Sequence, residues 1–178
     1  MKWKMFEFQS KDRPPFTTLP DDHEVIHGET YFNSAKNLMT EIYRDKCIDI
    51  FPDGRDFPCQ FLSVGSKTYF IKFTADNKVY SCRLWNKGSF YAPSRHVAHI
   101  MKADTQNNIN PKDPRKWFIL DIPRPGPFGL AFDRDLKKPL SFWFPVIGGW
   151  VQQEFYDHQM AINDMGVFRI PQACRDNS

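Results

Sequence analysis

The sequence lacks several features that define large protein classes. No apolar run approaches the roughly 18 residues of a membrane-spanning helix, so no transmembrane segment is expected. Charge of one sign is also missing: 24 Lys and Arg stand against 21 Asp and Glu, and this balance argues against a nucleic-acid partner. The first residues, MKWKMFEF, lack the apolar stretch of a secretory signal. Either the protein is cytosolic or the numbered chain omits a processed leader.

Motifs that mark common catalytic and cofactor sites are missing too. The sequence contains no G-x-S-x-G elbow, no P-loop, no G-x-G-x-x-G after a strand and no D-x-D-x-D-G calcium loop. Together these absences favour a protein that is not an enzyme and that needs no cofactor.

The histidines offer little for metal binding. His96 and His99 lie three residues apart but have no third ligand nearby, so no metal site is expected. His23 and His27, on an extended segment, would lie about 13 Å apart, too far to share an ion. An enzyme that uses His96 or His158 as acid or base ranks third among the hypotheses.

Cysteine is scarce, and its spacing is uninformative by itself. Cys47, Cys59, Cys82 and Cys174 form no C-x-x-C motif, which argues against a zinc knuckle and a thioredoxin-type site. Reduced core thiols and disulfides both remain open, and four cysteines allow three pairings.

Aromatic residues are abundant: the chain has 17 Phe, 5 Trp and 6 Tyr. Short aromatic and β-branched runs alternate with Pro, Gly, Asp and Asn clusters, the pattern of antiparallel strands joined by turns. Tight turns are predicted at residues 65–67, 76–78 and 148–149, and one short helix at 95–102. Strands are predicted at residues 2–8, 24–27, 38–48, 59–64, 68–73, 79–85, 116–122, 129–133, 140–145 and 150–157.

Alternation along three of these strands produces apolar faces. One strand aligns Leu140, Phe142, Phe144 and Val146, with Ser141, Trp143 and Pro145 on the other side; two further strands align Tyr69, Ile71 and Phe73, and Phe118, Leu120 and Ile122. Such a face must be covered. The sheet rolls over its own core, pairs with a second sheet, or leaves a cavity for an apolar ligand.

The order of several short motifs resembles the ependymin-related and LolA-like proteins of eukaryotes. The motifs span residues 28–174, from Cys47 through PCQFL (58–62), KTYF (67–70) and CRLW (82–85) to LAFDRDLKKP (130–139) and the closing FRIPQAC (168–174). The resemblance implies a mainly β fold with a strongly curved antiparallel sheet, as a half-barrel or two stacked sheets, enclosing a hydrophobic pocket with one short helix at its mouth. Residues 28–178 would form this single domain, and residues 1–27 an N-terminal extension with the first strands.

The resemblance also implies a location and a function. It implies a secreted or organelle-lumen protein whose disulfides pair Cys47 with Cys59 and Cys82 with Cys174. It implies a non-enzymatic carrier for a lipid or other hydrophobic small molecule, with Arg95 or Lys102 near a head group. The alternative is a structural subunit that binds other protein subunits and no ligand. The residues expected to line the ligand site are Tyr69, Ile71, Phe73, Phe118, Leu120, Phe132, Phe142, Phe144 and Phe155.

Overall fold

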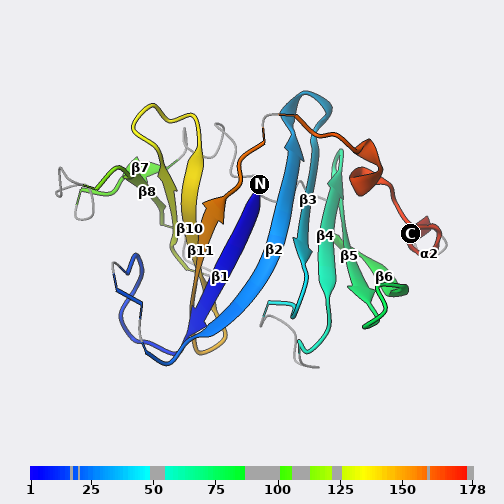
Figure 1. Ribbon diagram of the computed structural model, residues 1–178, viewed down its shortest axis with the longest axis horizontal. Coiled ribbons are helices and arrows are strands. Elements are labelled where there is room, and N and C mark those ends of the chain that lie inside the picture. Colours follow the sequence, from blue (N-terminus) through cyan, green and yellow to red (C-terminus); the bar gives the residue numbers. More distant parts are fainter. Residues whose placement is uncertain are drawn as a thin grey trace. The chain divides into compact units, whose positions relative to one another are not determined.

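A computed structural model of the 178-residue chain describes residues 1–16, 18–19, 21–48, 55–86, 101–105, 113–121, 126–159 and 161–175. Within these residues, eleven strands form one antiparallel sheet in the order β6-β5-β4-β3-β2-β1-β11-β10-β9-β8-β7 (Figure 1). The sheet is open, with β6 and β7 as its outermost described strands. The expected mainly β, antiparallel fold is therefore confirmed.

The strands are mostly short, and the described helical elements are shorter still. The strands are β1 (Lys2–Phe8), β2 (Glu24–Asn33), β3 (Leu38–Tyr43), β4 (Cys59–Val64), β5 (Lys67–Phe73), β6 (Val79–Asn86), β7 (Lys102–Ala103), β8 (Lys116–Leu120), β9 (Phe128–Phe132), β10 (Pro139–Val146) and β11 (Gly149–Tyr156). The helical elements are η1 (Ser34–Lys36), η3 (Met165–Phe168) and α2 (Gln172–Arg175). No helix among these described segments is long and apolar enough to cross a membrane.

Some predicted elements differ from the structure in their bounds, and one lies mostly outside the described residues. The strand predicted at residues 38–48 ends at Tyr43, because Arg44 makes the last backbone bond to His27 and Cys47 then turns away to bond with Cys59. The predicted helix at 95–102 lies outside the described residues up to position 100. Its last residue, Lys102, belongs to β7 and pairs with Ile119.

The tight turns predicted at three places are confirmed. Gly65 turns β4 into β5 with a φ of 62°, and Gly148 turns β10 into β11 with a φ of 75°. Asn77, between β5 and β6, has a φ of 59°. Glycine adopts this left-handed backbone without strain, and Asn tolerates it better than most residues.

The chain divides into two compact units. Unit 1 comprises Met1–Lys2, His27–Ala92 and Gln159–Ser178, and unit 2 comprises Trp3–Ile26 and Pro93–His158. The expected domain boundary between residues 27 and 28 falls inside β2. Unit 1 contains the consecutive hairpins from β2 to β6. Unit 2 contains those from β7 to β11, with β1 hydrogen-bonded beside β11.

Candidate functional site

The candidate site lies in unit 2, on one face of β8, β9 and β10. Alternation along β10 places Phe142 and Phe144 on the same side of the sheet. Phe142 lies opposite Leu130 of β9, and Leu130 lies opposite Phe118 of β8. Because directly opposed side chains share a face, these residues form one apolar row across three strands.

A second apolar row runs beside the first. Leu120 pairs with Phe128, and the register of β9 with β10 places Phe128 next to Phe144. We call the side of β8–β10 that carries both rows the ring face. Its defining residues are Phe118, Leu120, Phe128, Leu130, Phe132, Phe142 and Phe144.

The rings of this face contact one another. Phe128 and Phe142 are stacked, with an interplanar angle of 4° and centroids 6.1 Å apart, and Phe142 lies 5.2 Å from Phe144. Phe118 meets Phe132 edge-on at 6.0 Å. Phe118, Phe128 and Phe142 are only half-buried, whereas Phe132 and Phe144 are buried. The ring face is therefore apolar, continuous and partly accessible.

The opposite face of β8–β10 is covered by the segment that follows β1. Trp117, Ala131 and Trp143 form a buried cluster there. The guanidinium of Arg13 lies 5.3 Å from the centre of the Trp143 ring, and the backbone N–H of Phe16 donates to Oε1 of Gln152 at 2.9 Å. The segment that follows β1 thus packs on this face. The most buried ring of β10 is that of Trp143. It lies on the side of the strand that alternation predicts to be less apolar.

In unit 1, a C-terminal segment (residues 161–175) covers the apolar side chains of β4–β6. Phe168 and Cys174 join Leu62, Tyr69 and Ile71 in one buried cluster. Partly buried apolar residues packed against this cluster include Phe73, Ile162, Val167, Ile170 and Ala173. The side chain of Gln60 adds a hydrogen bond at 3.4 Å to the carbonyl of Val167.

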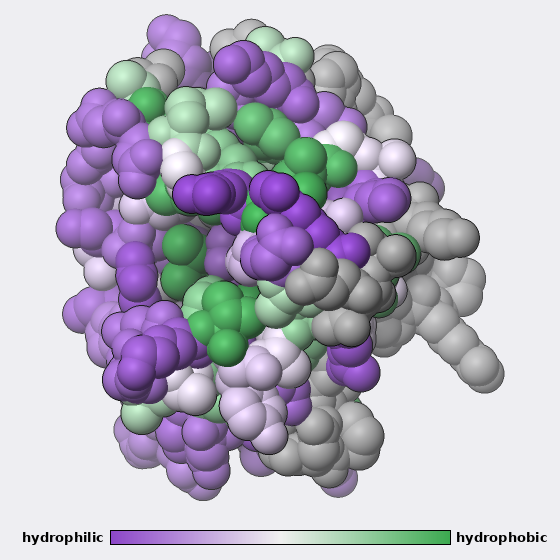
Figure 2. Space-filling model, turned by 90° about the vertical axis from the view of Figure 1, so that its right-hand side faces the viewer, coloured by the Kyte–Doolittle hydropathy of each residue, from purple (hydrophilic) through white to green (hydrophobic). Residues whose placement is uncertain are grey.

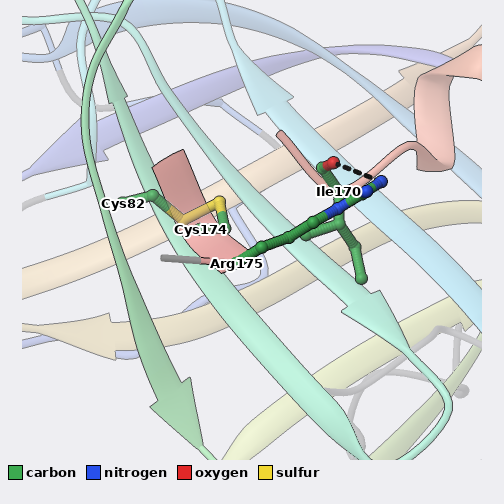
Figure 3. The surroundings of a disulfide bond; sticks show 4 residues. All are labelled: Cys82, Ile170, Cys174 and Arg175. Atoms are coloured by element: carbon green, nitrogen blue, oxygen red, sulfur yellow. Dashed lines mark hydrogen bonds between the residues drawn. A yellow bond between two sulfur atoms is a disulfide. The ribbon is translucent and has the colours of Figure 1, made fainter. Parts of the chain in front are cut away.

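A disulfide attaches this segment to β6. Cys174 of α2 is bonded to Cys82, and the neighbouring Arg175 donates a hydrogen bond to the carbonyl of Ile170 at 3.4 Å (Figure 3). The second disulfide joins Cys47 to Cys59. All four cysteines are bonded, so the pairing that the family resemblance implied is confirmed.

On the β6 and α2 side of the molecule, apolar surface is broken up by polar residues. Figure 2 shows green residues near the middle of this face, interrupted by strongly hydrophilic ones. Tyr80 and Val79 of β6 are the exposed apolar residues at the start of that strand, at 74% and 37% exposure.

The nine residues expected to line a ligand site fall into two groups. Tyr69 and Ile71 are buried under the C-terminal segment, and Phe73 packs against the same cluster. Six lie in unit 2, where the structure brings five of them together on the ring face: Phe118, Leu120, Phe132, Phe142 and Phe144. The sixth, Phe155, is buried on β11, on the same side of the sheet, because it lies four residues from Val151, the partner of Phe144.

The burial of two polar residues near the ring face was not predicted from the sequence. Glu7 and Gln153 are 4% and 1% exposed, although they belong to strands rich in apolar residues. Their signal in the sequence is alternation: Glu7 follows Trp3 and Met5 at intervals of two, and Gln153 follows Val151.

Two titratable groups of unit 1 with resolved pKa shifts, Glu29 and Tyr31, lie two residues apart on β2. The hydroxyl of Tyr31 donates to Oε2 of Glu29 at 2.5 Å, and Arg44 lies 3.2 Å from Oε1. The bond to Glu29 raises the pKa of Tyr31 to about 12. Burial opposes ionisation of Glu29, but Tyr31 and Arg44 outweigh it, so the pKa of Glu29 is lowered. The side chains of Tyr31 and Glu29 therefore stabilise each other in the fold.

The described histidines have structural contacts. Nδ1 of His27 lies 2.8 Å from Asp45, and the ring of His23 packs edge-on against Phe6 at 5.5 Å. Nε2 of His158 donates to the carbonyl of Pro139 at 2.6 Å. His96 and His99 lie outside the described residues. Within the part of the chain that the structure describes, no group of His, Cys, Asp or Glu side chains is arranged to hold a metal ion.

No protein-family model matches the chain, and no curated protein matches its sequence.

Proposed function

We propose that this protein is a non-enzymatic binding or carrier protein for a lipid or another hydrophobic molecule. The observation that carries the proposal is the ring face: apolar rows cross three strands, and three of the rings are half-buried. Apolar area withdrawn from water contributes about 25 cal/mol per Å², so a continuous aromatic surface provides affinity without specific polar contacts. Ligand sites are typically lined in this way.

The two disulfides support an extracytoplasmic location. Disulfides persist in secreted and lumenal proteins and are rare where thiols are kept reduced. Both cystines of this chain are buried. We therefore propose that the protein lies outside the cell or in an organelle lumen.

Native mass spectrometry of the protein from its own source, before and after organic extraction, tests the proposal. We expect an extractable mass in the lipid range and saturable rebinding of that extract. Phe142→Ala should weaken rebinding about tenfold, because it removes the central ring of the face. Ile119→Ala is the matched control, since Ile119 is also half-buried but packs against the cluster of the opposite face.

A protein that carries no extractable molecule and binds none saturably would overturn the proposal. It would favour the second hypothesis, a structural subunit that uses exposed apolar side chains such as Tyr80 and Ile147 to contact other proteins.

A further inference from the structure

We propose that the C-terminal segment (residues 161–175) is a redox-sensitive strap. Reduction of the Cys82–Cys174 disulfide releases it from β4–β6 and uncovers a second apolar binding face. All the residues involved belong to unit 1, so the proposal goes beyond the ring face of unit 2 and does not depend on the function proposed for that face.

The helical elements of the segment depend on their packing against the sheet. The elements η3 and α2 have four residues each, and helices this short are unstable in isolation. The backbone N–H of Arg169 donates to the carbonyl of Gly166, and that of Cys174 donates to Pro171. Because these bonds close turns within the segment, they do not attach it to the strands.

Side chains attach the segment to the strands. Phe168 is 6% exposed and packs in one cluster with Tyr69 and Ile71. The side chain of Gln60 donates to the carbonyl of Val167 at 3.4 Å. Apolar packing of this kind does not require a peptide, so another apolar group can compete for the same face.

The segment shows which chemistry the face accepts. It presents one aromatic ring, from Phe168, and aliphatic side chains from Ile162, Val167 and Ile170. A hydrophobic small molecule offers the same kind of surface, and its burial is favourable at about 25 cal/mol per Å². We therefore assign such a molecule as the occupant of the face after the segment has left.

The Cys82–Cys174 disulfide determines which of the two occupies the face. It bonds α2 of the segment directly to β6 (Figure 3). While this bond is intact, the segment is held at its face and excludes a competitor. Once the bond is cut, the segment is tethered through the chain that leads from β11, and its effective concentration at the face falls.

The two disulfides differ in their surroundings. Cys59 lies within the sheet, paired with Tyr43 on one side and Lys72 on the other, and the backbone N–H of Cys47 donates to the carbonyl of Arg55. Cys174 lies in the single turn of α2, which opens by local fraying. A reductant therefore reaches the Cys82–Cys174 bond first.

Reduction occurs by thiol–disulfide exchange with a dithiol. One thiolate of the dithiol attacks a sulfur of the cystine, forms a mixed disulfide and releases the other cysteine as a thiolate, which is then protonated. The second thiolate of the dithiol attacks the mixed disulfide, releases the second cysteine and closes the disulfide of the reductant. Two electrons and two protons thus pass from the dithiol to Cys82 and Cys174.

The first test measures the order of reduction in the wild-type protein. The folded protein is incubated with dithiothreitol, samples are quenched with iodoacetamide, and the alkylated cysteines are located by peptide mass spectrometry. We expect Cys82 and Cys174 to be alkylated about tenfold or more faster than Cys47 and Cys59. Equal rates, or the opposite order, would overturn the proposal.

The second test asks whether cutting the bond releases the segment. In Cys82→Ser/Cys174→Ser, hydrogen exchange in residues 161–175 should rise about tenfold or more, and the apolar probe anilinonaphthalene sulfonate should gain a saturable site. Cys47→Ser/Cys59→Ser is the matched control and should show neither change. Circular dichroism checks that both variants are folded; if the first is not, the wild-type protein reduced at Cys82–Cys174 is measured instead.

Phe142→Ala in the Cys82→Ser/Cys174→Ser background separates the strap from the ring face. The added probe site should persist, because Phe142 belongs to unit 2. Loss of the added site would place the probe on the ring face, which overturns the strap proposal and leaves the carrier proposal standing. Unchanged exchange in residues 161–175, or no added probe site, also overturns it.

Discussion

The indole of Trp143 lies directly over the backbone of Gly129, its cross-strand partner on β9. A Cβ added at Gly129 would sit 2.0 Å from both Nε1 and Cε2 of the indole. Trp143 is fully buried, so the ring has nowhere to retreat. The backbone of Gly129 is ordinary strand and does not itself require glycine. Glycine is required here because the indole of Trp143 leaves no room for a Cβ.

Gly129→Ala should therefore lower the free energy of unfolding by about 1–3 kcal/mol, the usual cost of overpacking a core. Urea denaturation followed by tryptophan fluorescence measures it. The control is the same substitution in a Trp143→Ala background, where the alanine should be nearly neutral. An equal cost in both backgrounds would show that the indole is not the cause.

Removing the Cys82–Cys174 disulfide should cost more stability than removing Cys47–Cys59. The two bonds join residues 92 and 12 positions apart. Because a longer loop loses more entropy on closure, we expect losses of about 4–5 and about 3 kcal/mol for the paired Cys→Ser variants. Chemical denaturation of both double variants gives the comparison. The reverse order would mean that native-state contacts, and not loop length, set the values.

Phe168 should account for much of the stability of the C-terminal segment. It is the buried residue of η3 and packs in the cluster with Tyr69 and Ile71. Phe168→Ala should cost about 3–5 kcal/mol and increase hydrogen exchange in residues 161–175. Met165→Ala, in the same turn but 41% exposed, should change either quantity little. Equal effects of the two variants would argue against the cluster as the anchor.

The Tyr31–Glu29 bond should contribute to stability within a defined pH window. The folded-state pKa of Tyr31 is raised from 10 to about 12, so its contribution is complete below pH 10 and is lost as pH rises through 12. The pKa of Glu29 is lowered from 4.5, so its contribution is present above that value and is lost as pH falls through the lowered pKa.

Tyr31→Phe should therefore lower the free energy of unfolding by about 1 kcal/mol at neutral pH, and by less at either extreme. Denaturation at a series of pH values measures the difference, and an absorbance titration locates the tyrosine pKa. Tyr80→Phe is the control, because Tyr80 is 74% exposed. A Tyr31→Phe deficit that does not change with pH would mean that the loss is packing alone.

Most of the sheet is predictable from the sequence, because strand alternation and turn residues are local signals. The strands at residues 2–8 and 59–64 have the predicted bounds. The strand predicted at residues 24–27 stops just before Gly28. In the structure β2 continues through this glycine, which pairs with Tyr43. A glycine inside a strand is tolerated when the ladder on both sides is complete, and a single sequence does not reveal its neighbours.

The candidate site was harder to predict. Alternation identifies Phe142 and Phe144 as neighbours, but it gives no sign that Tyr69 and Ile71 are covered by Phe168. That contact depends on where the chain returns after almost a hundred residues. Likewise β1 pairs with β11, a strand more than a hundred residues away, and no local pattern encodes that pairing.

The placement of β1 has a consequence for how the protein is made. The strands β7 to β11 each pair with a neighbour in the chain, so we expect their hairpins to form early. β1 lies between β2, the next strand to be synthesised, and β11, which begins only at Gly149. One edge of β1, which carries the fully buried Trp3 and Met5, therefore stays unpaired through most of translation. This apolar stretch of the nascent chain is where we expect a chaperone to bind.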